Sequence, residues 1–152
     1  MTRVDFYVLE QPTPRALDLV VCRLAEKAFL QGHRVHVRCA SAAHAEALDD
    51  LLWTFHDTSF VPHALLGTPE AQQVPVVVDA GDGEPRAADD VLINLHPDVA
   101  PFFSRFERVI ETTGEDEAGR QAARARYRYY RDRGYAIHNH QLDGRSGARD
   151  ES

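Results

Sequence analysis

The sequence predicts an α/β fold, a single Rossmann-like domain in which a mostly parallel central sheet of about five strands is flanked by helices. Short segments rich in Val, Ile, Phe and Tyr, which are typical of buried strands, alternate with segments whose apolar residues recur every three or four positions. This alternation of strand and helix favours parallel strands joined by right-handed crossovers. A length of 152 residues is enough for one domain with a core of its own.

The first half of the chain shows the alternation clearly. A buried strand is predicted at Val4–Leu9, and Thr13 followed by Pro14 is typical of a helix start, with a hydroxyl cap and a proline in the first turn. Apolar residues then recur with helical spacing as far as Gly32, which is a typical C-cap. The next expected elements are a strand at Val35–Cys39 and a helix at Ala42–Trp53, capped by Ser41.

The second half is less regular. The segment 56–66 contains Pro62 beside aromatic residues and is predicted to be a loop or an irregular edge. Residues 135–140 are expected to pack back on the body, and the chain divides into a domain at 1–141 and a polar, disordered tail at 142–152. The other expected elements are strands at Pro75–Asp79, Val91–Leu95 and Phe106–Glu111, a short helix at Pro97–Arg105, and a last helix that starts at 114–116 and ends at Gly134.

The composition indicates an ordinary globular protein, with 43% hydrophobic residues, 27% charged residues and a formal net charge of −7. The longest apolar runs are only a few residues, so no transmembrane helix is predicted, and the N-terminus lacks the apolar stretch of a signal peptide. Cys22 and Cys39 are too few for a disulfide framework and are interpreted as buried thiols. We therefore expect a soluble, cytoplasmic protein.

No pattern in the sequence predicts an active site. The turn after the first predicted strand lacks the glycine of a phosphate cradle, and the GxG motif at 81–83 is not followed by a helix. His138 and His140 could offer two metal ligands, but no acidic or cysteine partner stands at a recognised spacing. The acidic pair Asp89 and Asp90 is interpreted as solvated charge. We expect no catalytic residue, no bound metal and no cofactor.

The stretch 119–133 carries the main functional signal of the sequence. It holds six arginines against one acid, Asp132, so its local charge is +5, and the rest of the chain sums to −12 because −7 minus 5 is −12. A compact basic element on an acidic protein favours a specific anionic partner, whereas diffuse affinity for nucleic acid would predict a basic domain as a whole.

Helical geometry places five side chains of this stretch within an arc of about 100°. The sequence offers no acidic residue on the same face to relieve the repulsion between the arginines. The face is therefore either solvated surface with incidental charge or a docking strip for an acidic peptide or carboxylate. Ala122, Ala125 and Tyr129 lie on the opposite side and are expected to face the sheet, while the five residues of the predicted outward face are Arg120, Arg124, Tyr127, Arg128 and Arg131.

Five short motifs stand in order along the chain: FYVL at 6–9, LW at 52–53, SFVPH at 59–63, DVLINL at 90–95 and ARARYRYYR at 123–131. Together they resemble the chi subunit family of bacterial DNA polymerase III, from about residue 4 to about residue 137. The combination of SFVPH with the arginine–tyrosine helix is the specific part of the resemblance. Residues 142–152 have no counterpart in the family, and arginine stands wherever the family uses either lysine or arginine.

The resemblance implies a non-catalytic accessory subunit of the replicative holoenzyme. In the family, chi binds the psi subunit, which tethers it to the clamp loader, and it also binds the acidic C-terminal tail of single-stranded-DNA-binding protein (SSB). By position, the tail site falls on Arg124, Tyr127 and Arg128, with Arg120 and Arg131 as flanks. The surface that faces psi would include Trp53, Phe60, Val61 and Pro62.

Two other functions stay open on the residues alone. The arginine face could bind nucleic acid directly, although the charge of −12 on the rest of the chain should repel DNA. The chain could also be an enzyme with an unrecognised pocket, which would need convergent polar residues in a cleft at the carboxyl ends of the strands.

Overall fold

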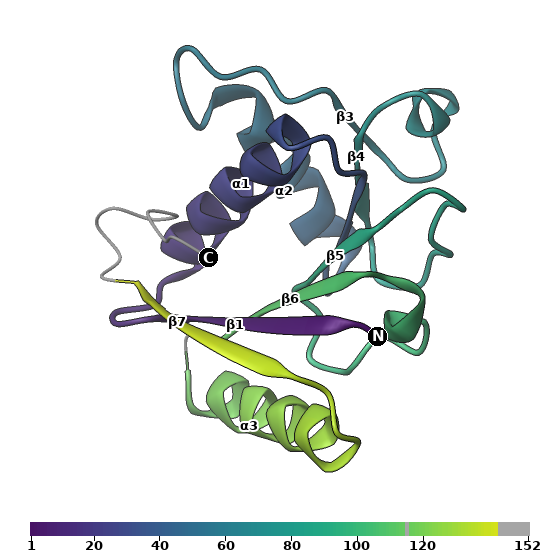
Figure 1. The fold of residues 1–152 in the computed structure, drawn as a ribbon. Helices are drawn as coiled ribbons and strands as arrows, with labels where there is room; N and C mark the ends of the chain where they lie inside the picture. Colours follow the sequence, from purple (N-terminus) through teal and green to yellow (C-terminus); the bar gives the residue numbers. More distant parts are fainter. Residues whose placement is uncertain (115, 143–152) are drawn as a thin grey trace.

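A computed structural model describes residues 1–114 and 116–142 as three layers, with one sheet between two helical layers (Figure 1). The tail predicted from residue 142 onward lies outside the described residues except for Leu142, which ends the last strand. The strands are β1 (Arg3–Leu9), β2 (Val35–Arg38), β3 (His63–Leu65), β4 (Val76–Asp79), β5 (Val91–Asn94), β6 (Arg108–Thr112) and β7 (Ile137–Leu142). The helices are α1 (Pro14–Leu30), α2 (Ala42–Thr54) and α3 (Glu117–Asp132), with 3-10 turns at Pro69–Gln72 and Phe103–Arg105.

The sheet confirms the predicted α/β class, because every strand pair in the described residues is parallel and the strand order is β3-β4-β2-β5-β6-β1-β7. It has seven strands where the sequence predicted about five. The first extra strand, β3, is only three residues long and follows Pro62, so its apolar pattern is too short to recognise. The second, β7, is an edge strand with exposed His138 and Asn139, and therefore lacks a continuous apolar run.

The helices divide between the two faces of the sheet. One face carries the larger apolar core, in which α1 and α2 pack on side chains such as Val37 and Ile93. The other face carries a smaller core, in which Tyr130 of α3 and Phe103 pack on residues that include Phe6. The predicted short helix at Pro97–Arg105 is wrong, since this segment forms only the turn Phe103–Arg105.

The second face also buries charge, on its β2–β4 half. His36 contacts Asp79 with Nε2 to Oδ2 at 2.9 Å, and its Nδ1 lies 3.7 Å from Oδ2 of Asp89. Asp89 in turn pairs with the Arg86 guanidinium at 2.7 Å. The interpretation of Asp89 as solvated charge is therefore wrong, because a histidine from β2 and an arginine three residues away enclose it in the fold.

We expect the stability of the protein to fall as pH rises above 6.5. Burial, the largest influence, lowers the pKa of His36, but hydrogen bonds and charges of Asp79 and Asp89 outweigh it and hold the pKa above its ordinary 6.5. The folded state thus binds this proton more tightly than the unfolded chain does. The stabilisation is complete below pH 6.5 and is lost as pH rises through the folded-state pKa, with a slope of at most about 1.4 kcal/mol per pH unit.

Urea unfolding between pH 6 and 9 measures this slope. The variant His36→Gln should show a shallower decline in the free energy of unfolding, whereas His138→Gln, an exposed control on β7, should keep the wild-type slope. Equal slopes in all three proteins would contradict a role for His36.

Within the described part of the chain, none of the helices combines the length and apolar composition needed to span a membrane.

Candidate functional site

The arginine-rich segment forms α3, which lies below the sheet in Figure 1 beside β1 and β7. The helix starts where Asp116 caps it, with its carboxylate accepting a hydrogen bond from the Gly119 amide at 2.7 Å. Two glycines allow the preceding turn to pack on the helix, because a Cβ on Gly114 would lie only 2.3 Å from backbone atoms of Gly119. Local sequence therefore fixes where α3 begins.

The rotation of α3 about its axis differs from the prediction. Its buried residues are Ala123, Arg126 and Tyr130, and Tyr127 is half-buried against the ring of Phe6, with the centroids 5.3 Å apart. Ala125, which was expected to face the sheet, is exposed. Ala122 and Tyr129, which were also expected to face the sheet, are only partly buried.

An inward-pointing arginine explains the rotation. Arg126 donates from Nε to Oε1 of buried Glu111 at 2.8 Å, and its two terminal nitrogens donate to the carbonyls of Pro97 at 2.8 Å and Thr112 at 3.0 Å. The Tyr130 hydroxyl donates to the other oxygen of Glu111 at 2.6 Å. A buried charge needs such partners, so this network sets which face of α3 turns inward.

This rotation brings three of the five predicted tail-binding residues to a groove beside the sheet edge. Arg120, Arg124 and Tyr127 line a cavity of about 180 Å³. The sequence did not identify the groove's other walls, which come from strands and loops distant in the chain: Phe6, Val8, Thr113 and Asn139, with Ala123 of α3.

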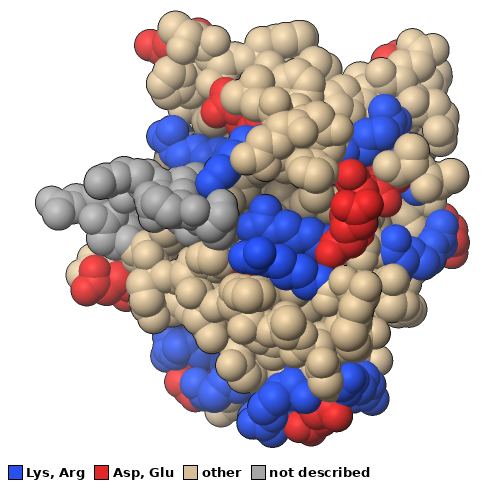
Figure 2. Space-filling view, viewed as in Figure 1, with Lys and Arg blue, Asp and Glu red and all other residues tan. Residues whose placement is uncertain are grey.

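The groove is basic at its rim and apolar at its floor. Figure 2 shows basic side chains gathered at the lower edge of the view, over α3. Glu117 in the first turn of α3 contacts Arg120 at 3.0 Å and Arg124 at 3.2 Å, and hydrogen bonds, first from Arg120, lower its pKa. The expectation that no acid relieves the arginine face is therefore wrong, since Glu117 lies one turn before Arg120 on the same side.

The other two predicted residues lie outside the groove. Arg128 is exposed, and Arg131 is exposed and pairs with its neighbour Asp132 at 3.0 Å. Arg128 lies on the side of the arc away from the sheet edge, whereas Arg131 shares the angular position of Arg120 and Arg124 but lies about two helical turns beyond Arg124, past the residues that line the groove.

The second predicted surface is an aromatic platform, which we define as Trp53 at the end of α2 and Phe60 in the loop before β3. These side chains are 50% and 64% exposed, and their ring centroids are 5.8 Å apart. Pro62 is half-buried beside them. Val61 was predicted to belong to the same surface, but it is fully buried in the larger core, so it supports the platform from beneath.

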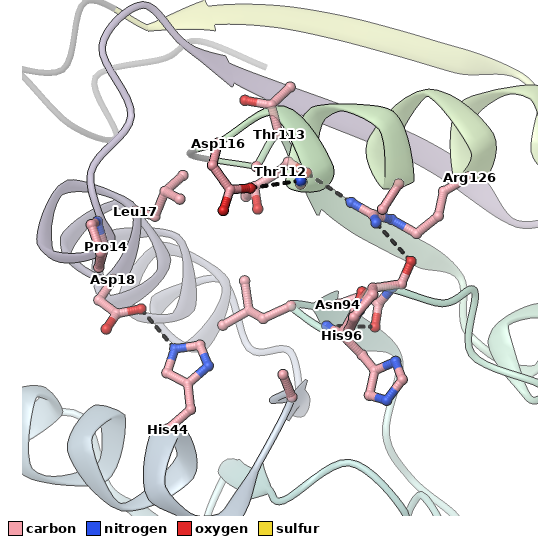
Figure 3. Close-up of a pocket in the computed structure, with 16 residues that line it drawn as sticks. Pro14, Leu17, Asp18, His44, Asn94, His96, Thr112, Thr113, Asp116 and Arg126 are labelled. Atoms are coloured by element: carbon pink, nitrogen blue, oxygen red, sulfur yellow. Dashed lines mark hydrogen bonds and ion pairs between the residues drawn. The ribbon is translucent and has the colours of Figure 1, made fainter.

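A second and larger hollow lies at the carboxyl ends of the strands, where enzymes of this fold class place their chemistry (Figure 3). Its volume is about 380 Å³, and its charged lining includes Asp18 paired with His44 at 3.0 Å. Of the polar side chains that line it, Arg126 is held as described and Asn94 donates to Glu111 at 3.0 Å, whereas the buried hydroxyl of Thr113 has no hydrogen-bond partner among the described residues. Among residues 1–114 and 116–142, no cluster of three His, Cys, Asp or Glu side chains could hold a metal ion.

Comparison with known proteins identifies the family. The family model described as "DNA polymerase III chi subunit, HolC" matches residues 1–138. The chain belongs to the DNA polymerase III chi subunit family. The family assignment supports the expectation that this chi-family chain has no catalytic activity of its own.

Curated relatives of this chi-family chain share nearly its whole length. The DNA polymerase III subunit chi of Pseudomonas aeruginosa is 44% identical over 142 residues, which cover 93% of this chain and 98% of the relative. The subunit chi of Escherichia coli is 30% identical over 141 residues, covering 90% of this chain and 96% of the relative. The crystal structure of T4 UvsW matches with a TM-score of 0.66 over 94% of this chain and 42% of that one; at 9% identity, it shares the fold alone.

Proposed function

We propose that this chain is a non-catalytic accessory subunit that links the clamp loader, through the psi subunit, to the acidic C-terminal tail of SSB. The observation that carries the SSB half is the groove, in which Arg120, Arg124 and Tyr127 stand together over an apolar floor. The aromatic platform of Trp53 and Phe60 supports the psi half. Family membership supports a role within the polymerase III complex.

The groove suits the end of an acidic peptide. The guanidinium groups of Arg120 and Arg124 can each bind a carboxylate, and the floor beside Phe6 and Tyr127 can receive an apolar side chain. A cavity of about 180 Å³ is smaller than the sites that enclose drug-sized ligands, so it accommodates a chain end and not a whole cofactor.

Glu117 occupies both guanidinium groups before a tail arrives. Because these pairs are exposed, exchanging Glu117 for a carboxylate of the tail costs little free energy. The exchange nevertheless keeps a single contact weak. We expect micromolar affinity for one tail, about −8 kcal/mol, with avidity supplied by the several tails of a multimeric SSB.

The two proposed sites lie far enough apart to bind two partners at once. The platform adjoins β3 at one edge of the sheet, and the groove adjoins β1 and β7 at the other. They also lie on opposite faces, since α2 packs on the larger core and α3 on the smaller one. This separation supports a linking role.

A labelled SSB-tail peptide, titrated by fluorescence anisotropy, tests the SSB half. Arg124→Ala should weaken binding about 10- to 150-fold, because a charge-assisted hydrogen bond contributes about 1.5–3 kcal/mol. Arg133→Ala is the matched control: it removes the same charge from the end of α3, where Arg133 stacks on Tyr129 away from the groove.

Unchanged affinity in Arg124→Ala would remove the groove from the proposal. Direct binding of nucleic acid through the same arginines is the competing function. Tight binding of single-stranded DNA without SSB, falling steeply with salt, would favour it.

A further inference from the structure

The aromatic platform exposes apolar surface that a soluble domain normally covers. In the described residues, the large hydrophobic side chains that are exposed are Met1, Leu30, Trp53 and Phe60. Leu30 lies one helical turn beyond Glu26, and Glu26 accepts a hydrogen bond from Ser59, the neighbour of Phe60. The loop that carries Phe60 is thus held against α1, and the exposed rings of Trp53 and Phe60 mark a contact surface beside it.

The platform is held in place before any partner binds. The Trp53 ring packs on buried His63, with centroids 4.1 Å apart. His63 is fixed in turn by the carbonyls of Val61 and Asp49, at 2.6 and 2.8 Å. Two aromatic rings on such a support lose little conformational freedom on binding, so the surface is prepared for a partner.

The surroundings of the platform are acidic. Asp49 and Asp50 lie one turn before Trp53 on α2, and Asp57 lies in the loop between Trp53 and Phe60. From residue 39 to residue 68, a range that covers α2, the loop of Phe60 and β3, the sequence contains four Asp and Glu residues and no Lys or Arg.

Asp49 and Asp50 are neighbouring carboxylates, and their negative charges repel each other. Burial, the largest influence, raises the pKa of Asp49; the charge of His63 opposes this increase, and the charge of Asp50 adds a smaller one. A partner that brought further negative charge would add to this repulsion, and an uncharged partner would desolvate carboxylates without pairing them. A cationic partner relieves both effects.

We propose that the platform binds a cationic amphipathic segment, in which apolar side chains cover Trp53 and Phe60 and flanking Lys or Arg residues pair with Asp50 and Asp57. The inference rests on the proposed function, in which the psi subunit supplies this segment. It adds the charge of the partner's segment: the platform would bind a basic segment, whereas the groove at α3 would bind an acidic one. One subunit thus recruits an acidic partner at one edge of its sheet and a basic partner at the other.

Calorimetric titration of the purified psi subunit of the same organism tests the inference at 50 and 300 mM NaCl. Trp53→Ala should weaken binding at least tenfold at both salt concentrations, because it removes the centre of the contact. Wild-type affinity should fall about tenfold with salt, and Asp50→Asn/Asp57→Asn should reduce that fall to about threefold.

The matched control is Asp82→Asn/Glu84→Gln, which removes the same charge from exposed residues in the segment between β4 and β5, outside the platform. This control should keep the wild-type salt dependence. If psi affinity depends on Trp53 but does not change with salt or in either double variant, the proposal that the segment is cationic would be overturned. The proposal that the platform binds psi would stand.

No binding of psi to the wild-type protein would overturn the psi half and this inference with it, while the SSB-tail titration would be unaffected. Binding of psi that Trp53→Ala leaves unchanged would overturn the platform itself. Sedimentation of the chain alone tests the remaining alternative, in which a second copy of this chain occupies the platform. Self-association that is lost in Trp53→Ala would support that alternative and overturn the proposal.

Discussion

Replacing Arg126 with methionine should lower the free energy of unfolding by about 3–5 kcal/mol, because it leaves the buried Glu111 carboxylate without its cation. Glu111 keeps only the Tyr130 hydroxyl at 2.6 Å and the Asn94 amide at 3.0 Å. The carbonyls of Pro97 and Thr112 also lose their donors. The loss is comparable with a large fraction of the stability of a typical domain.

Urea unfolding measures this loss, and Arg131→Met is the matched control because Arg131 is an exposed arginine of the same helix. Arg131→Met should stay within about 0.5 kcal/mol of wild type. The double variant Arg126→Met/Glu111→Gln should cost less than the sum of its single changes, since no buried charge is then left unpaired. Additive costs would contradict the proposed pairing.

The effect of Arg126→Met should also depend on pH. Burial, the largest influence, raises the pKa of Glu111, and Arg126 opposes that increase. Without Arg126 the folded protein prefers a protonated Glu111 more strongly, so stability falls further as pH rises above 4.5. The destabilisation should therefore be smaller at pH 5 than at pH 7.5. Affinity for the SSB tail should fall too, because Arg126 orients the helix that carries Arg124.

Replacing Arg86 with methionine should also cost about 3–5 kcal/mol, for the same physical reason at the other end of the sheet. The side chains of Arg86 and Asp89 are almost completely buried. The guanidinium donates to Asp89 at 2.7 Å and to the carbonyls of Ala71 at 2.7 Å and Pro75 at 3.1 Å. Arg86 thus ties the loop before β5 to the segment that leads into β4.

Thermal and urea unfolding measure this second loss, with Arg105→Met as the control. Arg105 is half-exposed and pairs with exposed Glu84 at 3.7 Å, so its loss should change stability by less than about 1 kcal/mol. Tail binding at α3 should be retained in the folded fraction of Arg86→Met. A stability loss no larger than that of the control would show that the buried pair is not required.

Most of the fold could be predicted from local sequence. Thr13 caps α1 by accepting from the Ala16 amide at 3.1 Å, and Ser41 caps α2 in the same way, as their positions before apolar periodicity predicted. The two edge strands escaped prediction because an edge needs neither length nor continuous apolarity. The pairing of β7 with β1, where Phe6 stands beside Asn139, becomes visible only when residues more than 130 positions apart are brought together.

The sequence by itself determined that an arginine helix exists, where it begins, and that the chain belongs with the chi subunits, because caps, periodicity and motif spacing are local properties. Only the tertiary structure decided which arginines share a groove. Charge counting treats Arg126 as one of six equal cations, but Glu111 of β6 draws it into the interior. That contact turns Arg120, Arg124 and Tyr127 toward the sheet edge, because a buried charge must be paired whereas an exposed one need not be. The groove ends before Arg131 and does not include Arg128.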